Sequence, residues 1–213
     1  MSLTPVLKKR KLASKPRIPV ELKKCSECKV YLINDLISPE ESKELLSYLH
    51  STYFNSNLSI SWTREGRREI TQFSNPMNLN YRYSGRDHYG HKMTDVMNAL
   101  LARVEKETRI KFNYILVNYY KHGGSGLPWH NDREDDLVCD GAIGGLSLGV
   151  TREFQFRSLS QPHNQQYHVS LNLKDGSFLM MDGCTQAHHE HRLPCSGMLC
   201  VYIPYNIFFR YKR

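Results

Sequence analysis

The second half of the chain is a series of short segments rich in β-branched and aromatic residues, and this series constrains the fold more than any other feature. After Lys111 the segments are separated by glycine, proline or polar residues, which is typical of successive strands. In order they are KFNYILVNYY, GGLSLGV, REFQFRS, QYHVSLNL, GSFLMMD, GMLCVYI and IFFRY. Within the series, YHVSLNLKDGSFLMM predicts a hairpin with Asp175 and Gly176 in its turn. Such a run predicts an antiparallel barrel or jelly roll.

Two helices are predicted before these strands. Ser38 is a favourable N-cap, Pro39 suits the first helical position, and Glu41 completes a capping box. Further along, residues 93–104 repeat apolar side chains at the i, i+3, i+4, i+7 spacing of a helix that lies on a core. The expected fold class is therefore α+β and mainly β, with the N-terminal helices packed on one side of the strands.

The length and hydropathy of the chain exclude several classes of protein. The 213 residues suit one domain. No apolar run approaches the roughly 18 residues of a membrane span, and the first 30 residues lack the apolar segment of a secretory signal. We therefore expect an intracellular monomer with no membrane partner.

The charge distribution favours an anionic partner. The formal net charge of +8 comes from 29 basic and 21 acidic residues, and such an excess suits nucleic acid, although a solvated basic surface is the alternative. Residues 1–28 are predicted to form a flexible basic tail. Its Lys8–Lys11 tetrad, KKRK, is typical of a nuclear address or of a phosphate contact, and a merely solvated tail stays open. The protein is expected in the nucleus or cytoplasm, with the nucleus favoured.

The six cysteines are expected to be reduced thiols, because disulfides are uncommon inside cells. Only Cys25 and Cys28 have the spacing of paired metal ligands, and a structural zinc site would need two more ligands at similar spacing. We interpret this pair as ordinary surface or core cysteines and leave metal binding open.

A histidine and an aspartate follow the glycine turn in NYYKHGGSGLPWHNDRED. In a strand, side chains two apart point to the same side, so His130 and Asp132 would face one space. Taken alone the pattern is weak, because His188 and Glu190 repeat it. A distal histidine from CTQAHHEHRLP would complete a facial triad of two histidines and one carboxylate. Such a triad leaves coordination positions open, as an iron(II) oxygenase needs for its cosubstrate and dioxygen.

Several motifs together resemble the AlkB family of iron(II) and 2-oxoglutarate dependent dioxygenases, in particular the branch that acts on alkylated nucleic acid. They are NYY followed by HND, SLG followed by REFQF, then HRLP and a closing NIFFR, and the resemblance runs from about Ser61 to Arg213. It implies a double-stranded β-helix fold with iron(II), 2-oxoglutarate and dioxygen as cofactor and cosubstrates. It also implies a domain over 29–213, with a nucleotide-recognition lid at about 59–90 and a catalytic core at about 111–213.

The resemblance also implies which residues hold the iron. Matched to the motifs, they are His130, Asp132 and His191. We choose His191 over His188 and His189 because it directly precedes RLP, where the family has its distal histidine before a similar Leu-Pro.

The implied contacts to the cosubstrate come from two strands. Asn118 and Tyr120 match the family's Asn-x-Tyr, while Asn206 and Arg210 match its closing strand. A guanidinium group suits a carboxylate because it can form two parallel hydrogen bonds with it.

The chain departs from the family at one position. The closing strand of the family usually carries a second arginine six residues before the last one, and this chain has Pro204 there. One carboxylate of 2-oxoglutarate would lose its usual ion pair. We expect Tyr120, Tyr202 or a basic residue such as Arg152 to substitute; weak cosubstrate binding or a degenerate enzyme are the alternatives.

Substrate contacts are implied on both sides of the metal. Glu134 lies where the nucleic-acid branch often has an acidic residue against the lesion base, and a carboxylate favours the cationic bases 1-methyladenine and 3-methylcytosine over neutral ones. The segment from Ser61 to Gly85 resembles the lid, whose aromatic and basic residues stack on a flipped base and contact phosphates. The lid residues implied are Trp62, Arg67, Arg68, Phe73, Tyr81 and Tyr83.

These features predict an oxidative demethylase that repairs N-alkylated bases in DNA, or possibly in RNA, releasing formaldehyde and succinate. Two alternatives stay open. The same oxidation could act on RNA or on a protein side chain, since the triad does not recognise the substrate. A catalytically silent nucleic-acid-binding module could keep the barrel and the basic lid, which Pro204 makes conceivable.

Overall fold

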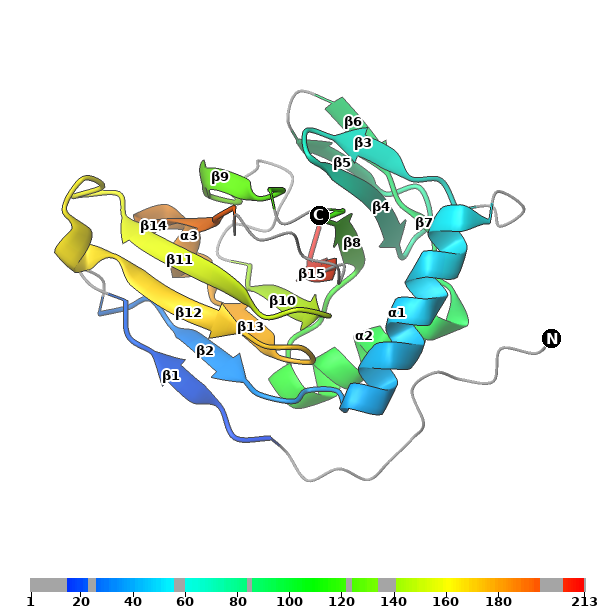
Figure 1. Cartoon of the computed structure of the whole chain (residues 1–213), viewed down its shortest axis with the longest axis horizontal. Helices are drawn as coiled ribbons and strands as arrows, with labels where there is room; N and C mark the ends of the chain where they lie inside the picture. The colour runs from blue at the N-terminus through cyan, green and yellow to red at the C-terminus, as the bar shows by residue number, and fades with distance from the viewer. Residues whose placement is uncertain are drawn as a thin grey trace.

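The computed structural model describes residues 15–22, 26–55, 60–83, 86–121, 124–133, 141–195 and 205–212 (Figure 1). Its helices are α1 (Pro39–Phe54), α2 (Asp95–Thr108), α3 (Gly183–His188) and the 3₁₀ helix η1 (Gln165–Tyr167). Its strands are β1 (Ile18–Val20), β2 (Val30–Ile33), β3 (Thr63–Glu65), β4 (Arg68–Ser74), β5 (Asn80–Tyr83), β6 (Arg86–Tyr89), β7 (His91–Lys92), β8 (Tyr114–Tyr119), β9 (Leu127–His130), β10 (Ile143–Leu148), β11 (Arg152–Ser158), β12 (Val169–Leu173), β13 (Phe178–Met181), β14 (His189–Leu193) and β15 (Tyr205–Arg210).

The strands of the described residues form three sheets. The main sheet has the order β1-β2-β13-β10-β15-β8-β4-β3, with β7 paired to β4. A minor sheet has the order β12-β11-β14-β9, and β5 pairs with β6 as a separate ribbon. Apart from the parallel β4–β7 pair, these strand pairs are antiparallel. The predicted mainly-β jelly roll is confirmed.

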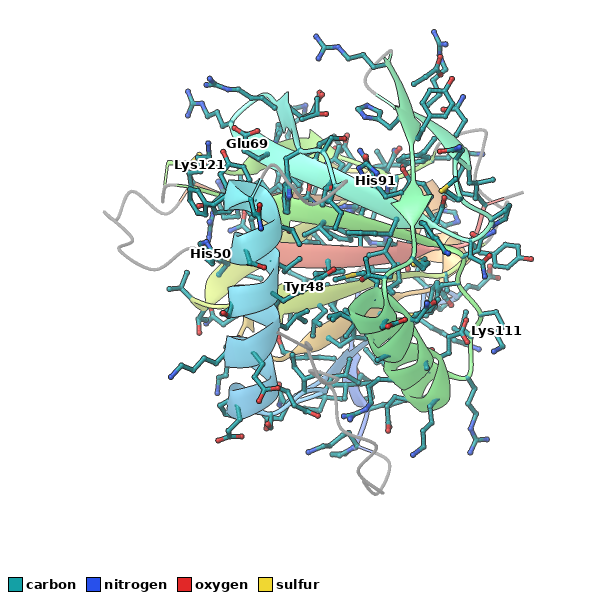
Figure 2. All side chains as sticks on the ribbon, turned by 90° about the vertical axis from the view of Figure 1, so that its right-hand side faces the viewer. Tyr48, His50, Glu69, His91, Lys111 and Lys121 are labelled. Carbon is teal, nitrogen blue, oxygen red and sulfur yellow. The ribbon has the colours of Figure 1, made fainter. Side chains whose placement is uncertain are left out.

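Helices α1 and α2 cover one face of the main sheet, as predicted (Figures 1 and 2). The capping box is present: the Ser38 hydroxyl accepts a hydrogen bond from the Glu41 N–H, and the Glu41 carboxylate accepts one from the Ser38 N–H. Tyr48 lies between the two helices in Figure 2, and its hydroxyl donates a hydrogen bond of 2.9 Å to Thr94, the N-cap of α2. This bond joins the start of α2 to the middle of α1.

Alternating side chains of the main sheet point into two separate cores. On β8 and β15 the odd-numbered residues, among them Val117 and Phe209, pack against the helices. The even-numbered apolar residues, among them Leu116 and Phe208, pack toward the minor sheet with Phe154 and Phe156 of β11. Because side chains alternate along a strand, polar residues at even positions of these strands also face the minor sheet.

The predicted hairpin at Asp175 and Gly176 is wrong. A turn is present, but β12 pairs with β11 whereas β13 pairs with β10 and β2, so the connection crosses from one sheet to the other. The Asp175 carboxylate accepts hydrogen bonds from the Gly149 N–H and the Ser42 hydroxyl, which hold the turn against the main sheet and α1. Gly176 has φ of +73°, and a Cβ there would lie 2.6 Å from a backbone oxygen, so only glycine fits.

Three further segments differ from the sequence predictions or lie beyond what the structure describes. Strands β9 and β14 were not predicted. The segment assigned to a flexible tail contains β1, which pairs with β2 and extends the main sheet; residues 1–14, including KKRK, lie outside the described residues. The predicted strand GMLCVYI falls entirely in residues 196–204, which are likewise outside them. No helix in the described segments is long and apolar enough to cross a membrane.

Candidate metal and cosubstrate site

A cavity of about 560 Å³ opens between the two sheets beside the β3–β4 turn. Its wall combines the minor-sheet strand β9, the inner face of β8 and β15, and the β3–β4 turn. The lining residues are Glu65, Gly66, Arg67, Arg68, Leu116, Asn118, Gly126, Leu127, Pro128, His130, Asn131, Asp132, Phe208 and Arg210.

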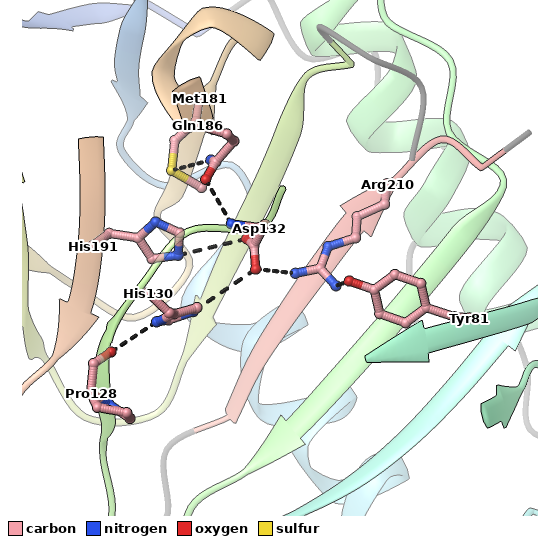
Figure 3. A network of polar contacts seen from close by, with 8 residues as sticks. All are labelled: Tyr81, Pro128, His130, Asp132, Met181, Gln186, His191 and Arg210. Carbon is pink, nitrogen blue, oxygen red and sulfur yellow. Dashed lines mark hydrogen bonds and ion pairs between the residues drawn. The ribbon is translucent and has the colours of Figure 1, made fainter. Parts of the chain in front are cut away.

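The three predicted metal ligands converge at this cavity (Figure 3). His130 at the end of β9 pairs in register with His191 on β14, and Asp132 follows two residues after His130. The distance from Asp132 to the Nε2 atom of His191 is 3.6 Å and to that of His130 is 3.9 Å. One ligand atom from each residue lies within 4.8 Å of the other two. This arrangement could hold a metal ion, and it includes His191 rather than His188 or His189.

Backbone and side-chain contacts fix the orientation of these ligands. The Nδ1 atom of His130 lies 2.8 Å from the carbonyl oxygen of Pro128, so its N–H donates there and Nε2 keeps its lone pair. The Asp132 N–H donates a 3.0 Å hydrogen bond to Gln186 of α3. The His191 ring stacks on Phe154, with ring centroids 5.3 Å apart. Each ligand is therefore held by a different element.

The electrostatics of the site favour metal binding. Burial lowers the pKa of His191 to about 3, so its ring is neutral and can act as a ligand. Burial alone would raise the pKa of Asp132, but Arg210, His191 and His130 outweigh it and hold that pKa below its usual range. The Arg210 guanidinium lies 2.7 Å from Asp132, and both side chains are about 5% exposed. Asp132 is thus an ionised carboxylate.

Of the predicted cosubstrate residues, Asn118 and Arg210 line the cavity, whereas Tyr120 and Asn206 are buried outside its lining. Asn118 on β8 pairs directly with Asn206 on β15, and Tyr120 follows the end of β8. Among the described residues, the buried Asn118 Oδ1 and Tyr120 hydroxyl have no hydrogen-bond partner, nor have Asp132 Oδ2 and His191 Nε2. Buried polar groups in native proteins are normally satisfied. These atoms therefore fit a bound metal ion with an oxygen-rich cosubstrate.

The substrate residues predicted on the lid do not all reach the cavity. Arg67 and Arg68 line it. Phe73 is fully buried in the core on the helix side of the main sheet, and Trp62 packs at the edge of that core against Tyr53. For these two the expectation of base contact is corrected, because their side chains point away from the minor sheet.

Tyr81 is buried as well, and its hydroxyl accepts a hydrogen bond from Arg210 rather than stacking at the surface. Tyr83 lies in β5 opposite Arg86.

Other predicted residues lie in segments that the structure does not describe. Glu134, Pro204, Tyr202 and Cys25 are among them. Cys28 is disulfide-bonded, in contrast to the expectation of reduced thiols, whereas Cys184 and Cys195 are not part of a disulfide. A sulfur in a disulfide is not the thiolate that a metal binds.

Three contributions at the site were missed from sequence. Gln186 holds the backbone of Asp132, Phe154 stacks on His191, and Arg210 binds Asp132 directly. The alternation of REFQF could have placed Phe154 on the inner face. No sequence pattern indicated Gln186, because α3 is short and its position depends on the fold.

Comparison with known proteins agrees with this geometry. A family model described as the 2OG-Fe(II) oxygenase superfamily matches residues 29–197. The chain belongs to this superfamily. The family implies iron(II), 2-oxoglutarate and dioxygen, and the triad of His130, Asp132 and His191 could bind the metal.

Its curated relatives are AlkB homologues, which confirms the resemblance found in the motifs. Alpha-ketoglutarate-dependent dioxygenase alkB homolog 3 of Mus musculus is 36% identical over 104 residues, covering 46% of this chain and 36% of the relative. DNA oxidative demethylase ALKBH2 of Bos taurus is 31% identical over 164 residues, covering 75% of this chain and 58% of the relative. The chain thus matches from about a third to three fifths of the length of these relatives.

Solved structures confirm the fold. One described as "The structure of OsALKBH1" has a TM-score of 0.64 at 11% identity, covering 92% of this chain and 100% of that one. The shared architecture is the jelly roll with its two facing sheets.

Proposed function

We propose that this protein is an iron(II)- and 2-oxoglutarate-dependent demethylase of N-alkylated bases, such as 1-methyladenine and 3-methylcytosine, in DNA or RNA. One observation supports the proposal most: the oriented His-Asp-His cluster lies in the same cavity as Arg67 and Arg68 of the lid. A metal site suited to oxidation and cationic groups suited to phosphate therefore share one opening. The relatives named as a DNA oxidative demethylase and an alkB homologue add to this support.

The residues of the site have different proposed roles. His130, Asp132 and His191 would fill three coordination positions of one metal ion and leave its remaining coordination positions open. When bound, iron(II) with 2-oxoglutarate and dioxygen supplies the oxidising chemistry that releases the methyl group as formaldehyde and leaves succinate. Asn118, Tyr120 and Asn206 would orient the cosubstrate by hydrogen bonds, and Arg210 keeps Asp132 ionised and fixed.

The lid side of the cavity suits a nucleic-acid strand. A second hollow beside the cavity is lined by Arg64, Arg67, Arg68 and Lys121 together with Glu69, and Lys121 is paired to Glu69 at 3.0 Å. The exposed Arg64 and Arg67 would contact backbone phosphates. We keep the proposal that Glu134 faces the lesion base, since a carboxylate favours a cationic base. Tyr81, being buried, would act by positioning Arg210.

A direct assay tests the proposed reaction. The protein is incubated anaerobically with iron(II), ascorbate and 2-oxoglutarate, and then with air and an oligonucleotide carrying 3-methylcytosine, as DNA in one series and as RNA in another. Loss of the methyl mass with an equal amount of succinate is expected. His130→Ala is the matched inactive variant, and His188→Ala, an exposed histidine outside the cluster, is the active control.

Three other outcomes would contradict the proposal in different ways. Tight binding of the oligonucleotide with no succinate would indicate a silent nucleic-acid-binding module. Succinate formed without loss of the methyl mass from either oligonucleotide would indicate another substrate, such as a protein side chain. Equal activity of His130→Ala and wild type would show that the cluster does not hold the reactive metal.

We also propose that the protein acts as a monomer inside the cell, in the nucleus or the cytoplasm. The +8 net charge supports a nucleic-acid partner. Sedimentation analysis and imaging of a version with KKRK replaced by alanines would test the two parts of this proposal. A stable dimer would contradict the first part, and a protein found in neither compartment would contradict the second; an unchanged nuclear distribution of the variant would show that KKRK is not a nuclear address.

A further inference from the structure

Two arginine side chains, one of which lines the cavity, converge on the buried Tyr120. In the pairing of β4 with β8, Ile70 is opposite Asn118 and Glu69 is opposite Tyr119, which brings Arg68 beside Tyr120. From the other sheet, the guanidinium carbon of Arg152 on β11 lies 5.8 Å from the centre of the Tyr120 ring. Tyr120 is thus enclosed by positive charge from both sheets.

Neither arginine is paired with a carboxylate among the described residues, unlike Arg103, Arg157 and Arg210, which bind Glu41, Glu190 and Asp132. Within the described residues, Arg152 donates to the carbonyl oxygens of Ser125 and Pro194, at 2.9 and 2.8 Å. Its Nη1 atom and the Nε atom of Arg68 are buried and have no hydrogen-bond partner in the described part of the chain. Arg152 is buried and Arg68 is half-buried, and cations removed from water without a counter-charge are costly, so this end of the cavity is suited to an anion.

The sequence suggests why two arginines lie beside Tyr120. An arginine that would serve the second carboxylate of 2-oxoglutarate is absent, since residue 204 is proline. Tyr205, the first residue of β15, pairs with Tyr119 of β8. Arg68 approaches that same end of β8 from its other neighbour, β4. A guanidinium group from β4 can therefore take the place of the arginine that the closing strand carries in the family.

We propose that Arg68 binds the distal carboxylate of 2-oxoglutarate in this protein, with the Tyr120 hydroxyl beside it. Arg68 lines the cavity together with Asn118, whereas Arg152 does not. Arg152 holds its position through two carbonyl groups and contributes positive potential behind Tyr120. This assignment rests on the proposed use of 2-oxoglutarate, and it replaces the expectation that Arg68 contacts nucleic acid and that Arg152 substitutes for the missing arginine.

A comparison of two oxoacids tests the assignment. 2-Oxobutyrate has the same 2-oxo acid head as 2-oxoglutarate but no distal carboxylate. Both acids are titrated calorimetrically into the full chain loaded with manganese(II), which binds the head without turnover. Wild type should prefer 2-oxoglutarate by roughly 10- to 100-fold, the range of charge-assisted hydrogen bonds. Arg68→Met should lose most of that preference while binding 2-oxobutyrate as wild type does.

The controls separate this inference from the proposed function. Unchanged 2-oxobutyrate binding shows that the Arg68→Met site is folded, and Arg68→Lys should keep part of the preference through its charge. Arg64→Met, an exposed arginine of β3, should keep all of it. If Arg68→Met retains the full preference, or if Arg152→Met alone abolishes it, the assignment to Arg68 is wrong. Wild-type protein that binds neither acid would instead overturn the proposed function.

Discussion

The two faces of β8 and β15 differ in what they contribute. The odd-numbered residues Ile115, Val117 and Phe209 are apolar, fully buried and packed under the helices. The even-numbered residues Asn118 and Arg210 are almost equally buried but polar, and they face the cavity. A shift of one residue along a strand therefore separates side chains that stabilise the fold from side chains that serve the site.

Buried polar atoms without a hydrogen-bond partner occur on both faces, and those of the cavity face belong to the proposed site. On the helix side, the Tyr48 hydroxyl has a partner in Thr94, whereas the Tyr205 hydroxyl has none among the described residues. On the cavity side, the Asn118 Oδ1 atom and the Tyr120 hydroxyl have none among the described residues, although both are buried. Burying polar groups without partners lowers stability, so we expect mutations on the two faces to affect different measurements.

The largest contrast should come from removing one large side chain on each side. His191→Ala should weaken metal binding by more than about 100-fold, because even the residues that support a ligand contribute 10- to 100-fold. Phe209→Ala should leave metal affinity within a few-fold but lower the free energy of unfolding by about 3–5 kcal/mol. Metal titration and denaturant unfolding of both variants measure the two effects.

A result in which Phe209→Ala weakens metal binding as strongly as His191→Ala would break the comparison. It would mean that the helix-side core sets the geometry of the triad. His188→Ala serves as the control for histidine removal, since that side chain is exposed and outside the cluster.

Metal binding should stabilise the cavity side and leave the helix side unaffected. At a metal concentration of 100 times the dissociation constant, the free energy of unfolding should rise by about 2.7 kcal/mol. For a domain of this size that corresponds to an increase in melting temperature of roughly 5–10 °C. Calorimetry with manganese(II) and with a chelator measures the shift.

The metal-induced shift should persist in Val117→Ala and disappear in His191→Ala. An equal shift in His191→Ala would show that the ion binds elsewhere.

Neighbouring residues of β8 offer a more closely matched pair. Val117→Ala removes two methyl groups from the helix-side core and should cost about 2 kcal/mol of stability, with normal cosubstrate affinity. Asn118→Leu keeps the size of the side chain and removes a buried atom that lacks a partner, so stability should stay equal or rise by up to about 1 kcal/mol. Its affinity for 2-oxoglutarate should fall roughly 10-fold. Urea unfolding and calorimetric titration measure the pair. A loss of stability in Asn118→Leu as large as in Val117→Ala would contradict the separation of the two faces.

The parts of this organisation that depend on local sequence were predictable. The capping box at Ser38 and the apolar spacing of α2 are properties of neighbouring residues, and both helices formed as expected. The alternation in β8 likewise indicated which side chains share a face. The three predicted metal ligands were assigned through the family motifs, and the structure brings them together.

The features that depend on pairing between distant strands could not be predicted from the sequence. Asp175 and Gly176 indicated a hairpin, yet the turn joins two different sheets because Ser42 and Gly149 hold it from outside the turn. Phe73 matched a lid aromatic by position, but the pairing of β4 with β8 turns it to the helix side. The approach of Arg68 to Tyr120 depends on that same long-range pairing. No local pattern contains it.

The smallest effects should come from single hydroxyl groups on the two sides. Tyr48→Phe removes one hydrogen bond to the half-buried Thr94 hydroxyl, which still accepts from the Met97 N–H, and should cost about 1 kcal/mol of stability. Tyr120→Phe removes a hydroxyl that has no hydrogen-bond partner in the described residues, so its free energy of unfolding should stay within about 0.5 kcal/mol of the wild-type value. Burial raises the pKa of Tyr120, so its hydroxyl stays protonated and can donate. Tyr120→Phe should therefore weaken 2-oxoglutarate binding about 3- to 10-fold, while Tyr48→Phe leaves it unchanged. Thermal unfolding measures the stability of both variants, and calorimetric titration measures their affinity for 2-oxoglutarate. Wild-type affinity in Tyr120→Phe would show that this hydroxyl does not contact the cosubstrate.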